Sequence, residues 1–175
     1  MTVTTETTTE ISARVHEVRG LLDADPQLAQ AHDPAVLVER VGPLQFRAVD
    51  DAGRAVSSDL PAVVGGADAH MTPGTLLRAA LGCCDATALA LEAAARGIEL
   101  SRLEVSVESD SDHRGLLGFP DVEPGPLSVQ VRYRLASANA TDDQLRALVD
   151  HAEQHSPVLS ALRREVPVQI DVQLD

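Results

Sequence analysis

The chain has 175 residues, of which 2% are aromatic and none is tryptophan, and its formal net charge at pH 7 is -13. Its 27 acidic residues outnumber its 14 basic ones, and it has few rings on which bases could stack, so we expect neither nucleic acid nor an anionic membrane as a partner. Its length suits one well-buried domain, whose core must consist mainly of Ala, Val and Leu.

Residues 1–34 are predicted to be an extension outside the main domain. The first ten, MTVTTETTTE, are polar and lack the basic start and the apolar run of a secretory signal, and we expect them to be disordered. Apolar residues then recur at helical spacing through ISARVHEVRGLLDAD, which predicts a short amphipathic helix that ends near Pro26. No later segment approaches the roughly 18 apolar residues of a membrane span, so we expect a cytoplasmic protein.

Residues 35–175 are predicted to form an α+β domain with the element order β-β-α-β-β-α-β. A β-hairpin with its tip near Gly53 comes first, and after a central helix two antiparallel strands are joined by a long loop rich in Gly and Pro. Thr141 caps the second helix, Pro157 closes it, and the segment VPVQIDVQL is predicted to be the last strand.

The central helix is predicted to run from Thr72 to Gly97. Thr72 suits the N-cap, Pro73 suits the first helical position, and Gly97 suits a left-handed stop. The charged side chains of this helix share one narrow stripe, and most of the remaining circumference is small and apolar, which is typical of a largely buried helix. The residues of the stripe are Arg78, Asp85, Glu92 and Arg96.

The two cysteines of the chain, Cys83 and Cys84, are neighbours in this helix, and we expect both to be reduced thiols. Because successive residues of a helix point about 100° apart, Cys83 lies nearly opposite the charged stripe and Cys84 at its border. Cys83 is therefore interpreted as a small buried hydrophobic residue. Cys84 is the candidate reactive thiol, and a cation that favours its thiolate form would come from Arg47 or Arg54 of the first hairpin.

Metal and nucleotide motifs are absent from the sequence. The six histidines are spread over different predicted elements, and no HExxH, CxxC, GxGxxG, Walker or GxSxG pattern occurs. His151 and His155 are four residues apart on one helix, a spacing that can chelate a metal but more often forms a solvated polar face. We therefore predict no metal and no cofactor.

Three stretches of the chain resemble the OsmC/Ohr family of osmotically induced and organic-hydroperoxide-resistance proteins, from about Leu44 to the C-terminus. They are SDLPAVVGGADAHMTPGTLLRAALGCCDATAL, GIELSRLEVSVESDSDHRGLLG and HSPVLSALRREVPVQIDV, and the most specific part is the TP-x-x-LL-x-AAL-x-x-C helix. The resemblance implies an intertwined homodimer with two sites formed between the subunits. It also implies a cysteine-based peroxidase, in which a thiolate becomes a sulfenic acid and a second cysteine resolves it as a disulfide.

Counted from Pro73, Cys84 falls on the peroxidatic cysteine of that family. The acidic residue that usually follows the proline is Gly74 here, and the resolving cysteine that usually precedes Pro-Val is Ser156. A serine cannot form the disulfide, and Cys83 is a poor substitute because it points about 100° away from its neighbour on the helix.

Three functions remain open from the sequence. The first is a one-cysteine reductase of small organic hydroperoxides in oxidative-stress defence, which an external thiol would regenerate. The second is a non-catalytic relative that binds a small apolar ligand at the dimer interface. The third is a structural oligomer with two inert thiols, in which Cys84 would resist alkylation.

Overall fold

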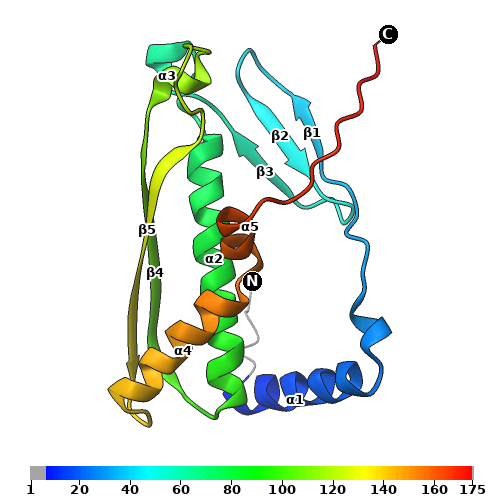
Figure 1. Cartoon of the computed structure of the whole chain (residues 1–175), viewed down its shortest axis with the longest axis vertical. Coiled ribbons are helices and arrows are strands. Elements are labelled where there is room, and N and C mark those ends of the chain that lie inside the picture. The colour runs from blue at the N-terminus through cyan, green and yellow to red at the C-terminus, as the bar shows by residue number, and fades with distance from the viewer. Residues whose placement is uncertain (1–6, 175) are drawn as a thin grey trace.

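A helix of 23 residues, α2, forms the axis of the structure, a computed structural model that describes residues 7–174 (Figure 1). Strand β4 and helices α1, α4 and α5 pack directly against this helix. In chain order the elements are α1 Thr8–Ala24, η1 Pro26–Ala29, β1 Leu37–Arg40, β2 Phe46–Val49, β3 Ala55–Ser58, η2 Ala62–Val64, α2 Pro73–Ala95, β4 Leu100–Ser111, α3 His113–Leu116, β5 Pro126–Ser137, α4 Asp142–His155 and α5 Pro157–Arg163. The predicted α+β class is confirmed.

Both ends of α2 follow from the sequence as predicted. The Thr72 hydroxyl accepts a hydrogen bond from the Thr75 N–H at 3.1 Å, which satisfies one of the free donors of the first turn. Gly97 has φ 66°, a left-handed conformation that residues with a side chain avoid, and its N–H donates to the Ala94 carbonyl at 3.0 Å. Gly82 allows close packing on β4, because a Cβ there would lie 3.4 Å from Val107 Cγ2.

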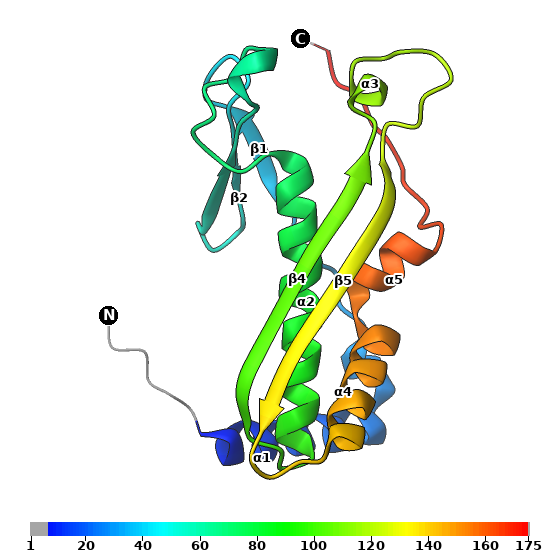
Figure 2. The same cartoon turned by 90° about the vertical axis from the view of Figure 1, so that its left-hand side faces the viewer.

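Two antiparallel sheets flank the central helix. The sheet β1-β2-β3 lies beside the N-terminal end of α2, and its β2–β3 turn contains Gly53 at φ 80°, which confirms the predicted hairpin tip. Strands β4 and β5 form a long ribbon along α2, with Val105 paired to Tyr133 (Figure 2). The break predicted at Gly42-Pro43 separates β1 from β2, so three strands precede α2 rather than two.

The hydrophobic core lies at the C-terminal half of α2, where α4 and the inner face of the β4–β5 ribbon meet it. Five buried residues form its centre: Leu89, Ala93, Ile98, Leu148 and Ala152. On the opposite side of α2, apolar side chains remain exposed in both halves of the helix, with Leu77 39% and Leu91 44% exposed. One side of the central helix is therefore packed within this chain, while another side presents apolar surface.

Helix α1 begins earlier than predicted, at Thr8. A capping box explains the start, since the Thr7 hydroxyl and the Glu10 carboxylate each accept a hydrogen bond from the other's backbone N–H. The expectation of disorder is therefore wrong for Thr8–Glu10, and residues 1–6 lie outside the described residues. The helix ends at Ala24, just before Pro26, as predicted.

The C-terminal third of the chain departs from the sequence prediction at three places. The long loop contains the short helix α3, and the segment after Pro157, predicted to be a turn, forms helix α5 because Ser156 and Pro157 suit its N-cap and first position. The predicted last strand, 166–174, has no strand pairing in the part of the chain that the structure describes. A strand needs a neighbour for its backbone hydrogen bonds, and this segment has none in the single chain.

By length and composition α2 could cross a membrane, and it is the one helix within residues 7–174 that meets this test. The prediction that no segment approaches a spanning length is therefore wrong by this criterion. The evidence for a span is weak, since the core helix of a soluble protein passes the same test. The buried carboxylates of α2 contact other elements of the same chain instead.

Candidate functional site

The candidate thiol, Cys84, lies in the middle of α2 and is half-buried, while its neighbour Cys83 is exposed. The prediction that Cys83 is buried is wrong for the single chain. Its cause is the orientation of α2: Asp85 and Glu92 of the charged stripe face inward and are 0% and 6% exposed. The side of the helix that carries Cys83 faces outward, while Leu81 and Leu89 are buried beside the carboxylates.

Inward charged groups are tolerated on α2 because each has a polar partner. The Tyr133 hydroxyl donates a hydrogen bond to Asp85 Oδ2 at 2.7 Å, and Glu92 accepts hydrogen bonds from Arg19 and Arg96. Burial of a charge without such partners would cost several kcal/mol. The two carboxylates of the charged stripe are thus buried together with polar partners, while Arg96 remains exposed.

Asp85, the residue that follows the candidate thiol, is buried and pairs with the half-buried Tyr133, a contact that the sequence alone did not predict. The second oxygen of the carboxylate, Oδ1, is buried without a hydrogen-bond partner among the described residues. Burial, together with the hydrogen bond to Asp85 and its charge, raises the pKa of Tyr133, which therefore stays protonated as a donor. The signal in the sequence was an acidic residue next to Cys84 and the only tyrosine of the chain on an alternating strand.

The two arginines predicted to activate the thiol do not reach it within this chain. Arg47 lies exposed on β2, and the Arg54 guanidinium, 80% exposed, pairs with Asp50 at 2.5 Å across the hairpin turn. Neither has a hydrogen bond to Cys84 anywhere in residues 7–174. The sheet that carries them extends away from the middle of α2, as both views in Figures 1 and 2 show.

The residue at the resolving position, Ser156, has a structural role at the junction of α4 and α5. It is 1% exposed, and its hydroxyl accepts a hydrogen bond from the Leu159 N–H at 3.3 Å, which caps α5. Gly74, where the family carries an acid, lies in the exposed first turn of α2, and a Cβ there would be 3.8 Å from Arg78 Nη1. Arg78 itself donates to Ser109 on β4 and to Thr75.

A cavity of about 400 Å³ lies between β5 and α5. Apolar side chains form most of its wall, and the phenol of Tyr133 and the ion pair between Glu153 and Arg163, 3.2 Å apart, supply the polar groups. The remaining lining residues are Pro126, Leu127, Ser128, Val129, Val131, Leu159 and Leu162. Such a space suits a small, mostly apolar molecule.

The paired histidines of α4 lie away from the cysteines, towards α1. The rings of His151 and His155 stack with their centroids 4.1 Å apart, and His151 contacts Glu92. Within residues 7–174 no three His, Cys, Asp or Glu side chains are grouped in a way that would hold a metal ion.

A known protein family and several solved structures match this chain. A family model described as OsmC-like protein matches residues 65–171. Among solved structures, an OsmC-like protein from Mycoplasma pneumoniae is 16% identical with a TM-score of 0.63, covering 77% of this chain and 89% of that one. An organic hydroperoxide resistance protein from Elizabethkingia anophelis is 20% identical with a TM-score of 0.55, covering 77% of this chain and 90% of that one.

A third solved structure, an organic hydroperoxide resistance protein OsmC from Legionella pneumophila, is 18% identical with a TM-score of 0.54 and covers 74% of this chain and 89% of that one. At these identities the likeness concerns the fold. No curated protein sequence matches this chain.

Proposed function

Because the chain belongs to the OsmC-like protein family, we propose that it is a cytoplasmic, thiol-dependent reductase of small organic hydroperoxides that acts in oxidative-stress defence. The observation that carries this proposal is the position of Cys84: a reduced, half-buried thiol in the middle of the helix that matches the family pattern from Pro73 onward. Two of the solved structures of this fold are named organic hydroperoxide resistance proteins, which supports the same substrate class.

The proposed reaction uses one protein thiol. The Cys84 thiolate attacks an oxygen of the hydroperoxide, so that an S–O bond forms and the O–O bond breaks. Sulfur is oxidised to a sulfenic acid, and the leaving alkoxide takes a proton and departs as an alcohol. One external thiol then displaces water to give a mixed disulfide, and a second releases the Cys84 thiol as the external disulfide forms. Ser156 takes no part, because it cannot form the internal disulfide.

A homodimer belongs to this proposal, and the exposed side of α2 supports it. That side carries Leu77, Ala80, Cys83, Thr87 and Leu91, and its two leucines are 39% and 44% exposed. Contiguous apolar surface of this kind is typical of an interface. A second copy of α2 against it would enclose the thiols, and its first hairpin could supply the arginine that this chain's own hairpin holds away from Cys84.

The unpaired C-terminal segment gives the homodimer further support. Its alternate residues are apolar and 45% to 90% exposed in the single chain: Val166, Val168, Ile170, Val172 and Leu174. Alternation of this kind fits a strand with one buried face, and the segment lacks only a neighbouring strand. Pairing with a sheet of the assembled dimer would meet that need.

A second candidate function is binding of a small apolar ligand without catalysis. Two observations favour it: Ser156 caps α5, and a cavity of about 400 Å³ with apolar and polar side chains in its wall is present between β5 and α5. In this alternative the thiols are retained for packing at the interface, and the polar group of the ligand meets the Tyr133 hydroxyl.

Stopped-flow oxidation by cumene hydroperoxide separates the two functions. We expect the wild type and Cys83→Ser to lose one thiol per chain at stoichiometric peroxide, and Cys84→Ser to lose none on the same timescale. A gain of one oxygen on the Cys84 peptide of Cys83→Ser, seen by mass spectrometry, identifies the sulfenic acid. If the wild type keeps both thiols while its circular dichroism is unchanged, the reductase proposal is wrong, and the binding function and the structural oligomer with inert thiols are the remaining alternatives.

A further inference from the structure

We propose that the N-terminal extension is a reversible clasp: α1 binds the C-terminal end of α2 at neutral pH and is released in acid, when a protonated His151 replaces Arg19 beside Glu92. The clasp is separate from the proposed thiol chemistry, since Glu92 lies near the C-terminal end of α2 and Cys84 lies in its middle. Helix α1 also lies outside residues 65–171, the part of the chain that the family model matches.

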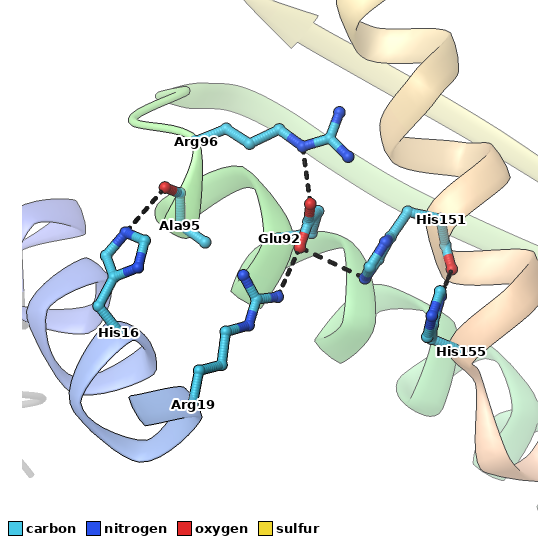
Figure 3. Close-up of polar contacts among 7 residues, drawn as sticks. All are labelled: His16, Arg19, Glu92, Ala95, Arg96, His151 and His155. Carbon is cyan, nitrogen blue, oxygen red and sulfur yellow. Dashed lines mark hydrogen bonds and ion pairs between the residues drawn. The ribbon is translucent and has the colours of Figure 1, made fainter. Parts of the chain in front are cut away.

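The central observation is that one carboxylate oxygen serves two elements (Figure 3). Glu92 Oε2 accepts a hydrogen bond from Arg19 Nη2 of α1 at 2.7 Å and lies 3.3 Å from His151 Nε2 of α4. The other oxygen, Oε1, accepts from Arg96 Nε at 2.7 Å. The Glu92 side chain is only 8% exposed, so a protonated His151 would compete with Arg19 for Oε2 at a site with little water.

Helix α1 packs against α2 through partly exposed side chains rather than through a buried face. No described residue of α1 is buried, and its apolar contacts come from half-buried side chains such as Ile11 and Val15. Within residues 7–174 the other long-range polar contact of α1 joins His16 Nε2 to the Ala95 carbonyl oxygen at 3.2 Å, at the end of α2 (Figure 3). An element that has no buried side chain can open at a free energy below that of global unfolding.

The charges set the direction of the switch. With His151 neutral, Glu92 faces two guanidinium groups, and protonation adds a third cation around a single carboxylate. Partial burial lowers the pKa of His151 and the charges of Arg96 and Arg19 act in the same direction, while Glu92 opposes them. Burial raises the pKa of Glu92, but the hydrogen bonds from Arg19 and Arg96 outweigh it and hold that pKa below its usual range, so the carboxylate stays ionised in mild acid.

The sign of the pH dependence follows from linkage. When α1 leaves, Arg19 and some of the cover over the cluster leave with it, so the released state binds a proton at His151 more readily than the docked state. Docking is therefore favoured above the ordinary imidazole range, near pH 6.5, and weakens as the pH falls below it. The protonated His151 then donates to Glu92 Oε2 in place of Arg19.

Two other histidines, His16 and His155, lie near Glu92 and His151, and neither reverses the direction of the pH dependence. His16 is exposed, and its contact with a carbonyl is available to the neutral ring as well as the charged one, provided that Nε2 carries the proton. His155 stacks on His151 and contacts the His151 carbonyl oxygen through Nδ1, so a charge on it would repel a charge on His151 without touching Glu92.

Hydrogen exchange of the full-length chain tests the clasp. After correction for intrinsic exchange, we expect amides of α1 to lose about tenfold in protection between about pH 7.5 and about pH 5.5, with those of α2 and α4 unchanged. His151→Gln should abolish this pH dependence. His155→Gln is the matched control, since it removes the neighbouring imidazole but leaves the Glu92 contact, and it should retain the response.

Arg19→Gln provides a second test at a half-exposed position where folding is not in question. This variant should show fast exchange of α1 at both pH values. Equal protection of wild-type α1 at the two pH values, a response that survives in His151→Gln, or full protection of α1 in Arg19→Gln would each overturn the proposal.

Discussion

The pair formed by Asp85 and Tyr133 gives the sharpest test of how α2 accommodates charge in its interior. Replacing Tyr133 with Phe removes the side-chain hydrogen bond that the Asp85 carboxylate receives within residues 7–174, at 2.7 Å, and Asp85 is 0% exposed. A hydrogen bond to a charged group contributes about 1.5–3 kcal/mol, and a buried acceptor left without a donor loses its solvation as well. Because Oδ1 already lacks a partner, we expect Tyr133→Phe to lower the free energy of unfolding by about 2–3 kcal/mol.

Urea unfolding at one fixed protein concentration measures this change, because an assembled protein is stabilised by its own concentration. The midpoint should fall while the m-value stays constant. The companion variant is Asp85→Leu combined with Tyr133→Phe, which replaces both polar partners with apolar groups and should recover most of the loss. A Tyr133→Phe variant within about 0.5 kcal/mol of the wild type would refute the reasoning, since surface changes have effects of that size.

Three further predictions concern the core, acid stability and the resolving position. Leu148→Ala, at a fully buried core position, should cost about 2–5 kcal/mol in urea unfolding, whereas Val168→Ala in the exposed C-terminal segment should change the value by less than about 0.5 kcal/mol in the single chain. Burial raises the pKa of Asp59, but hydrogen bonds from backbone N–H groups and a glutamine amide outweigh it and lower that pKa to about 2 from 3.8. Its contribution to stability is therefore present above pH 3.8 and lost as the pH falls towards 2, and Asp59→Asn should flatten an acid titration of the unfolding midpoint over that window. Ser156→Ala should lower the free energy of unfolding by about 1 kcal/mol, because the cap of α5 is lost. Ser156→Cys, treated with one equivalent of hydroperoxide, should form a disulfide with Cys84 that non-reducing peptide mapping detects. Sulfenic acid without that disulfide would show that the two positions do not meet.

Local signals predicted the long elements well. Thr72 and Gly97 mark the two ends of α2 because a hydroxyl cap and a left-handed glycine act within one turn and need no tertiary contact. The alternation of Val129, Val131 and Tyr133 likewise predicted the strand that became β5. Signals of this kind lie entirely within the segment that they specify.

The orientation of α2 could not be predicted in the same way. A helical wheel gives the angle between the charged stripe and Cys83, but it does not say which side meets the rest of the chain. Arg19 and Tyr133 decide that question, and they lie 73 and 48 residues away from Glu92 and Asp85 in the sequence. Because each carboxylate has a polar partner, the charged side of α2 can be buried within the chain without leaving an uncompensated charge.

The orientation of α2, with its carboxylates inward and Cys83 outward, also explains why the candidate site is incomplete in one chain. A helix that turns its paired charges inward leaves its small apolar side, with Cys83, Leu77 and Leu91, to be covered by another surface. Within residues 7–174 the two candidate activating arginines, Arg47 and Arg54, have no hydrogen bond to Cys84, and the segment 166–174 has no strand partner. One assembly of two chains would supply cover for the helix, an arginine for the thiol and a sheet edge for the segment. Each of these three needs is therefore a reason to expect that Cys84 reacts as part of a dimer, and a monomer in dilute solution should lose its reactivity towards hydroperoxide together with its association.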